Sequence, residues 1–142
     1  MNLSIYDNPK FVEVLEETIY PSSFICSYVA SAIKMLQGDD VKIYGFAHDD
    51  NPTSVYFSEE DLKEGHHFAV FNERFIIDCW IYQDYNRSVF DLNKEEDRNI
   101  IEYIYGNKYK WTDVTLSSYD FKKLFSNKYP NLLDFYNKHR IS

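Results

Sequence analysis

The sequence predicts an α+β fold, in which helices flank a small, mainly antiparallel sheet. Apolar residues recur at helical spacing in residues 8–37 and again in residues 94–140. Short strand-like runs and a hairpin lie between these two regions. A chain of 142 residues is large enough for one domain with a real core, so we expect a single domain over residues 1–142.

The first helix is expected over residues 8–20. Asn8-Pro9 is a helix start signal, and Pro21 ends the pattern. Between them, apolar residues follow at helical spacing: Phe11, Val14, Leu15 and Ile19.

A second helix is expected directly afterwards. Ser22 and Ser23 can cap its N-terminus, because serine side chains accept hydrogen bonds from the first free N–H groups of a helix. Gly38 and Asp39 stop it. Its apolar positions include Ile25, Val29, Ile33 and Leu36.

The central part of the chain is expected to supply the sheet. Residues 41–47 read as a strand, residues 48–54 as a loop and residues 58–65 as a short acidic helix or turn. Residues 65–80 are expected to form a hairpin, and residues 80–92 to be part strand and part loop.

The C-terminal part returns to helical patterns. A helix is expected over residues 94–106, ended by Gly106, and a strand over residues 109–116. Residues 117–140 predict one or two helices with a break before Pro130, because the residue before a proline disfavours the helical conformation.

The composition argues against several classes of function. The formal net charge of −8 and the scattered Lys and Arg residues disfavour nucleic-acid binding, since an acidic surface repels phosphate. Two cysteines are too few for a disulfide scaffold. Residues 1–20 lack a signal-peptide pattern, and no apolar run reaches the roughly 18 residues that span a membrane. We therefore expect a chain made in the cytoplasm, although a specialised secretion system could export it without a cleaved signal.

Cys26 is the first candidate for chemistry, because it lies near the start of the second helix. The helix dipole and the free N–H groups at that end stabilise a thiolate and can hold an oxyanion. A buried structural cysteine is the alternative interpretation, and it is common for this residue type.

The hairpin supplies two further candidates, His67 and Asp78. With an even number of residues in the loop, the facing positions place His67 opposite Asp78, with Cβ atoms about 4.5–5.5 Å apart. A carboxylate at that distance can fix the tautomer of an imidazole and stabilise its charged form. An odd loop would shift the register by one residue and offer His66 to Asp78 instead.

Together, Cys26, His67 and Asp78 have the order and types of nucleophile, base and orienting carboxylate in a thiol enzyme. The arrangement resembles the papain-like superfamily in the broad sense. "CSYVASAIKML" is similar to the Cys-x-x-x-Ala helix of transglutaminase-like members. "HFAVFNERFIIDCW" is similar to their His strand, turn and Asp strand, and to those of arylamine N-acetyltransferases and papain-fold bacterial toxins.

The resemblance covers roughly residues 21–80 and implies a papain-like core, with N-terminal helices on a small antiparallel sheet and further helices at the C-terminus. It also implies catalytic roles for Cys26, His67 and Asp78 and no cofactor. The implied activity is cleavage of an amide bond through a thioester, as a glutamine deamidase, an amidase or a peptidase. The partner would be a protein or peptide with an amide side chain or backbone, and the chain would suit a bacterial effector or toxin.

Other interpretations remain open from the sequence. Cys79 follows Asp78 and points to the opposite face, so a structural thiol is expected there. A metal site from His48, His66, His67 and Cys79 is disfavoured, because adjacent histidines on a strand point to opposite faces. A non-catalytic acidic binding protein, such as an immunity or adaptor protein, is the alternative function. The reactivity of Cys26 separates it from the enzyme.

Overall fold

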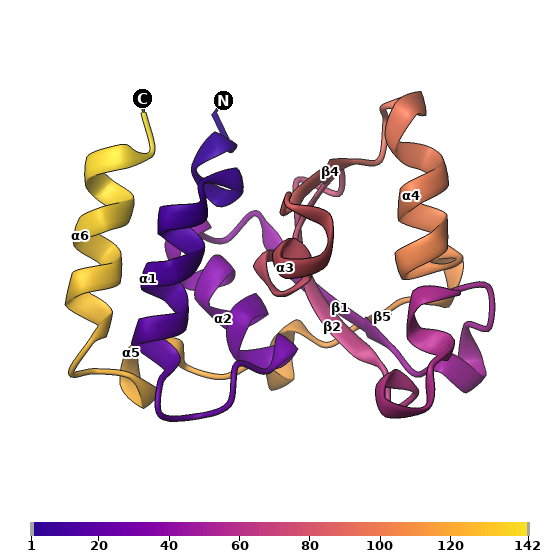
Figure 1. Ribbon diagram of the computed structural model, residues 1–142, viewed down its shortest axis with the longest axis horizontal. Coiled ribbons are helices and arrows are strands. Elements are labelled where there is room, and N and C mark those ends of the chain that lie inside the picture. Colours follow the sequence, from indigo (N-terminus) through magenta and orange to yellow (C-terminus); the bar gives the residue numbers. More distant parts are fainter. Residues whose placement is uncertain (1, 142) are drawn as a thin grey trace.

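The computed structural model describes residues 2–141, which form an α+β fold with a five-stranded antiparallel sheet in the order β4-β3-β2-β1-β5 (Figure 1). The strands are β1 (Val41–Phe46), β2 (His66–Phe71), β3 (Phe75–Ile77), β4 (Val89–Asp91) and β5 (Thr112–Asp113). Six α-helices lie in these residues: α1 (Pro9–Ile19), α2 (Cys26–Gln37), α3 (Tyr82–Tyr85), α4 (Glu95–Tyr105), α5 (Phe121–Leu124) and α6 (Tyr129–His139). The α+β fold class that the sequence predicts is confirmed.

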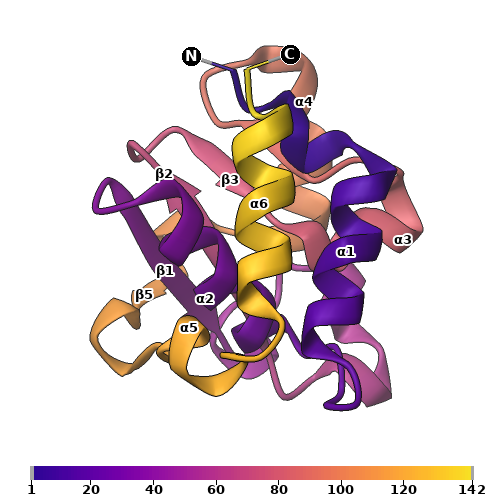
Figure 2. The ribbon, with the colours of Figure 1, turned by 90° about the vertical axis from the view of Figure 1, so that its left-hand side faces the viewer.

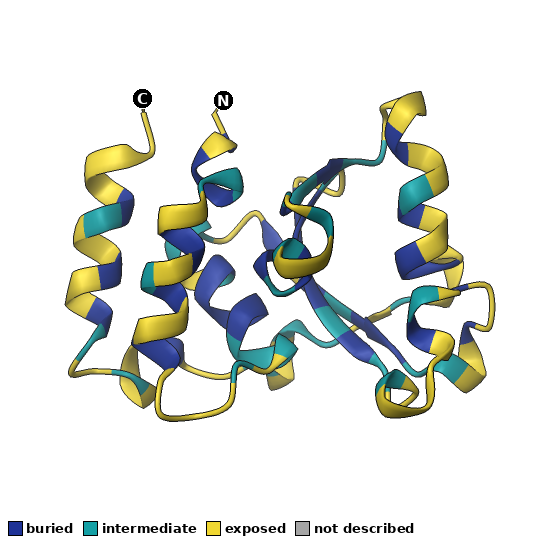
Figure 3. Ribbon diagram, viewed as in Figure 1, coloured by how far each residue is buried: buried dark blue, intermediate teal, exposed yellow. Residues whose placement is uncertain are grey.

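The helices cover the two faces of the sheet unequally. Helices α1, α2 and α6 form a layer on one face, seen from outside in Figure 2, whereas α4 lies on the other side of the sheet in Figure 1. Strand β2 contributes side chains to the cores on both faces of the sheet, because alternate side chains of a strand point to opposite faces. Ala69 and Phe71 pack in the core beneath the helical layer, and Phe68 and Val70 pack in the core beneath α4. Figure 3 shows the buried residues on the inner sides of these helices.

The N-terminal helices begin in different ways. Helix α1 begins at Pro9, where the Asn8-Pro9 start signal predicts, and the side chain of Asn8 caps it by accepting a hydrogen bond from the Lys10 N–H at 2.9 Å. Helix α2 has no side-chain cap, so the expected capping by Ser22 and Ser23 is wrong. The chain runs on in non-helical conformation after Ser23, with Ile25 as the N-cap residue. Cys26 is consequently the first helical residue of α2.

The register of the hairpin differs from the even-loop expectation. Ala69 pairs with Ile77 and Val70 with Ile76, so three residues, 72–74, connect β2 to β3. Asn72 and Glu73 both have left-handed backbone conformations, with φ of 54° and 56°, and the N–H of Arg74 closes the turn onto the Phe71 carbonyl at 3.1 Å. The odd loop shifts every facing pair by one residue, as the alternative register requires.

The strand expected over residues 109–116 is much shorter in the structure. Strand β5 comprises only Thr112–Asp113, and short 3₁₀ helices precede and follow it. The Asp113 carboxylate accepts the Thr115 N–H at 2.9 Å, which turns the chain. The Thr115 hydroxyl then accepts the Ile43 N–H at 2.9 Å, in the place of a strand carbonyl. In the C-terminal segment, α5 ends at Leu124 and α6 begins at Tyr129, so the chain breaks before Pro130 as expected. The reason differs from the expected one, because Tyr129, the residue before the proline, is itself helical and Pro130 lies in the first turn of α6.

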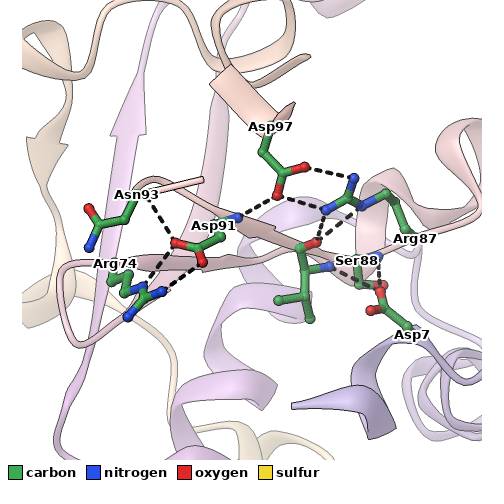
Figure 4. Close-up of polar contacts among 8 residues, drawn as sticks. Asp7, Arg74, Arg87, Ser88, Asp91, Asn93 and Asp97 are labelled. Carbon is green, nitrogen blue, oxygen red and sulfur yellow. Dashed lines mark hydrogen bonds and ion pairs between the residues drawn. The ribbon is translucent and has the colours of Figure 1, made fainter. Parts of the chain in front are cut away.

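Strand β4 is fixed by a group of charged side chains (Figure 4). The Arg87 guanidinium donates to both carboxylate oxygens of Asp97, at 3.1 and 2.9 Å, and so ties the start of β4 to α4. The Asp7 carboxylate accepts the N–H of Ser88 at 2.6 Å and brings the N-terminal segment to the same strand. The Ser88 carbonyl in turn accepts the N–H of Asp78 at 2.8 Å. This group therefore supports the backbone that carries Asp78.

Among residues 2–141, no helix is both long enough and apolar enough to cross a membrane.

Candidate active site

Cys26 lies at the N-terminus of α2, half-buried beside the first residues of β2. Its sulfur accepts the backbone N–H of His67 at 3.4 Å. In the described part of the chain, the N–H groups of Cys26, Ser27 and Tyr28 donate no hydrogen bond to protein acceptors. These donors can therefore stabilise negative charge on the sulfur or on an oxygen bound next to it.

The histidine that meets Asp78 is His66. Its Nε2 lies 2.6 Å from Asp78 Oδ2, and both side chains are almost completely buried. The prediction that His67 faces Asp78 is wrong, because the three-residue loop shifts the register and leaves the His67 ring on the opposite face of β2. His66 shares its face with Phe68 and Val70.

Asp78 is held in place by three donors. Its Oδ2 accepts from His66 and from the Tyr105 hydroxyl at 2.7 Å, and its Oδ1 accepts the Trp80 N–H at 3.2 Å. The ring of Phe57 stacks on His66 with centroids 4.5 Å apart, and Trp80 packs against it at 5.0 Å. The imidazole therefore has little freedom to turn away from the carboxylate.

The two reacting groups have complementary pKa changes. Burial alone would lower the pKa of His66, but the charge and hydrogen bond of Asp78, together with the Cys26 sulfur, raise it to about 9. Burial likewise raises the pKa of Cys26, but the hydrogen bond and charge of His66 and the N–H of His67 outweigh it, so the net change is downward. At neutral pH these shifts favour a thiolate–imidazolium pair.

A surface cavity of about 400 Å³ opens onto Cys26. Its floor includes a row of three residues that face one another across the sheet, Thr112 on β5, Gly45 on β1 and His67 on β2. The remaining lining residues are Ser27, Phe46, Ala47, Glu64, Gly65, His66 and Val114. The thiol of the pair thus borders a space that can admit a small group.

Cys79 lies apart from this cavity, in the core beneath the helical layer. Burial raises the pKa of its thiol, and its sulfur lies 3.8 Å from the Tyr6 carbonyl. Its environment is that of the structural cysteine expected from the sequence. In residues 2–141, no group of three or more His, Cys, Asp and Glu side chains is arranged to hold a metal ion.

The sequence predicts that Cys26 and Asp78 belong to the same site, but it does not reveal the aromatic side chains around them. Tyr105 is the most consequential of these, and its contact joins the end of α4 to the end of β3. No local pattern links these positions, since the helical spacing of α4 indicates only that Tyr105 is buried. Trp80 also packs against His66, and its indole N–H donates to the Phe24 carbonyl at 3.1 Å.

Comparison of this chain with protein-family models, with curated proteins and with solved structures finds no match.

Proposed function

We propose that this protein is a cysteine-dependent enzyme that cleaves amide bonds through a thioester, with Cys26 as nucleophile, His66 as base and Asp78 as the group that orients His66. The observation that carries the proposal is the buried His66–Asp78 pair beside a thiol at a helix N-terminus, at the edge of an open cavity. Thiol catalysis needs a nucleophile, a base that contacts it and a carboxylate that orients the base, and Cys26, His66 and Asp78 supply these three groups.

The reaction follows from the protonation states. The Cys26 thiolate attacks the amide carbon, and the oxygen that becomes negative can bind the free N–H groups at the start of α2. The His66 imidazolium gives its proton to the leaving nitrogen, the C–N bond breaks, and an acyl thioester remains on Cys26. Neutral His66 then takes a proton from water, whose oxygen attacks the thioester, and the C–S bond breaks to release the acid and the thiolate.

The cavity favours a small acyl group over a large one. Its volume of about 400 Å³ lies near the lower end of the usual range for ligand sites. A glutamine or asparagine side chain of a protein or peptide fits such a space, so deamidation is our preferred reaction, with peptide cleavage as the neighbouring possibility. The helix on an antiparallel sheet is the basis for proposing a papain-like core. The role of a bacterial effector or toxin is proposed by analogy with that group of enzymes.

The test uses a defined mixture of short peptides containing glutamine and asparagine, incubated with the wild-type protein and analysed by mass spectrometry. We expect replacement of side-chain NH₂ by OH in a subset of peptides, and loss of this product in Cys26→Ala and His66→Ala. Cys79→Ala is the matched control, since it removes the other thiol without touching the cavity, and it should keep the activity. Equal products with wild type and with a folded Cys26→Ala would eliminate the proposal and favour a non-catalytic binding protein.

A further inference from the structure

His67 has a different environment from the neighbouring His66. Its ring lies on the floor of the cavity beside Cys26. Within residues 2–141 the ring nitrogens of His67 make no hydrogen bond to the protein. His66, in contrast, is fully engaged with Asp78. A half-buried imidazole without a protein partner next to a nucleophile is available to a bound molecule.

Gly45 makes room for this ring. A Cβ atom at position 45 would lie 2.5 Å from Cδ2 and 3.0 Å from Nε2 of His67, well inside contact distance. The backbone of Gly45 is ordinary strand, so glycine is not needed there for its conformation. The absence of a side chain lets the His67 ring lie across β1, on the floor of the cavity.

The ring is also kept neutral. Burial lowers the pKa of His67, and the charge of His66 lowers it further. A neutral imidazole has one nitrogen that donates a hydrogen bond and one that accepts. Within the described residues, the lining of the cavity contains no Lys or Arg. The one cation in it, the His66 imidazolium, donates its Nε2 proton to Asp78 Oδ2, with the nitrogen and oxygen 2.6 Å apart, and so does not compete with that proton for the accepting nitrogen of His67.

A substrate amide needs such an acceptor. Its carbonyl oxygen pairs with the free N–H groups at the start of α2, which leaves the N–H groups of the amide nitrogen to be satisfied. The other acceptors among the lining side chains are the hydroxyls of Ser27 and Thr112 and the exposed carboxylate of Glu64. Glu64 and Thr112 are exposed, whereas Ser27 and His67 are both partly buried. Of these two, His67 presents a fixed ring acceptor in the row that it forms with Gly45 and Thr112 on the cavity floor.

We infer that the His67 imidazole is a substrate-binding group that accepts a hydrogen bond from the amide N–H of the substrate, and so selects carboxamides that carry an N–H. This inference rests on the proposed function, because it assigns the substrate class of the same site. It separates the roles of the two adjacent histidines. His66 moves the proton, and His67 recognises the group that leaves.

The experiment uses two alkylating probes that differ only at the amide nitrogen, iodoacetamide and its N,N-dimethyl derivative. The ratio of their rates at Cys26 is compared with the ratio for a free thiol peptide, so that the thiolate fraction of Cys26 cancels. We expect the wild type to favour iodoacetamide by about five- to tenfold beyond the peptide, the factor of one ordinary hydrogen bond. His67→Leu, which keeps bulk but has no acceptor, should abolish the excess.

Two further variants separate hydrogen bonding from shape. His67→Asn restores an acceptor and should recover part of the excess, whereas Gly45→Ala displaces an intact His67 ring and should lose it. An unchanged ratio in His67→Leu would overturn the inference and leave the proposed function standing. A Cys26 that reacts no faster than the free peptide would instead reject the proposed function, and this inference with it.

Discussion

Replacement of Asp78 by asparagine separates a catalytic carboxylate from a merely structural one. Asp78 is the main group that raises the pKa of His66 from its ordinary 6.5 to about 9, a difference of about 2.5 pH units. That difference corresponds to a factor of about 300 in the protonation equilibrium, since each pH unit is tenfold. In Asp78→Asn the charge is gone while burial still lowers the pKa, so His66 is neutral at pH 7. The Cys26 thiolate loses its counter-ion, but the Asp78 charge that raises the Cys26 pKa is lost as well, so we expect the thiolate population at pH 7 to fall by up to about 300-fold.

The fall is measured as the rate of iodoacetamide labelling of Cys26 against pH, followed peptide by peptide. Cys79, buried in the core, serves as an internal control for unfolding. The variant amide replaces the Oδ2 acceptor with an NH₂ donor, so His66 Nε2 and the Tyr105 hydroxyl must change from donors to acceptors. A charge-assisted contact is lost in the exchange, and we expect a loss of about 1–3 kcal/mol in the free energy of unfolding. A folded Asp78→Asn protein that labels at Cys26 with the wild-type rate and pH profile would refute the assignment of Asp78.

Three further substitutions test the surroundings of the site and the fold. In Tyr105→Phe the Asp78 carboxylate loses a donor at 2.7 Å and attracts the imidazolium more strongly, so the pKa of His66, read by NMR, should rise further above about 9; an unmoved titration contradicts this. Cys26→Ala removes the contribution of the sulfur to the His66 pKa but keeps the larger contribution of Asp78, so the pKa of His66 stays raised in the folded variant. Urea denaturation should therefore show stability that is full below about pH 6.5 and is lost as the pH rises through the folded His66 pKa, which lies below the wild-type value of about 9; a flat profile would argue against a raised His66 pKa. In Asp97→Ala the Arg87 guanidinium loses two hydrogen bonds, and the free energy of unfolding should fall by about 2 kcal/mol, whereas Asp134→Ala, which breaks an exposed pair with Lys138, should change it by less than about 0.5 kcal/mol; equal effects would contradict the role of Asp97.

The wild-type protein should differ from Cys26→Ala in this pH range. Between about pH 6.5 and 8.5 the unfolded chain carries a proton on the Cys26 thiol, whereas the folded chain carries it on His66. The number of bound protons is then nearly equal in both states, and the contribution of the pair to stability is independent of pH.

The sequence predicted those elements whose signals are local. The Asn8-Pro9 start of α1 and the Gly106 end of α4 depend on neighbouring residues alone, and both lie where expected. The hairpin register depends on the turn, and Asn72 and Glu73 adopt left-handed conformations that are uncommon for glutamate. Both registers are therefore compatible with the sequence, and the turn conformation that decides between them is not predictable from the residue types.

In the site, too, the features with local sequence signals could be predicted and those that depend on packing could not. A thiol at a helix start and a carboxylate at the end of a strand are local features, and the structure brings Cys26 and Asp78 to one histidine as expected. The identity of that histidine depended on the register. The contact of Tyr105 with Asp78 arises only when α4 packs on the sheet, and no spacing along the chain signals it.

The most direct test of the proposed chemistry is the ionisation of Cys26 in the resting protein. The ultraviolet absorbance of the thiolate is titrated in the wild type and in Cys26→Ser, and the difference between the two reports Cys26 alone. Because the pKa of Cys26 is lowered and that of His66 raised, we expect the thiolate signal to be present at pH 7 and to disappear only in acid. A signal that appears only near the ordinary thiol pKa of about 8.5 would show that Cys26 and His66 form no ion pair, and the proposed nucleophile would be lost.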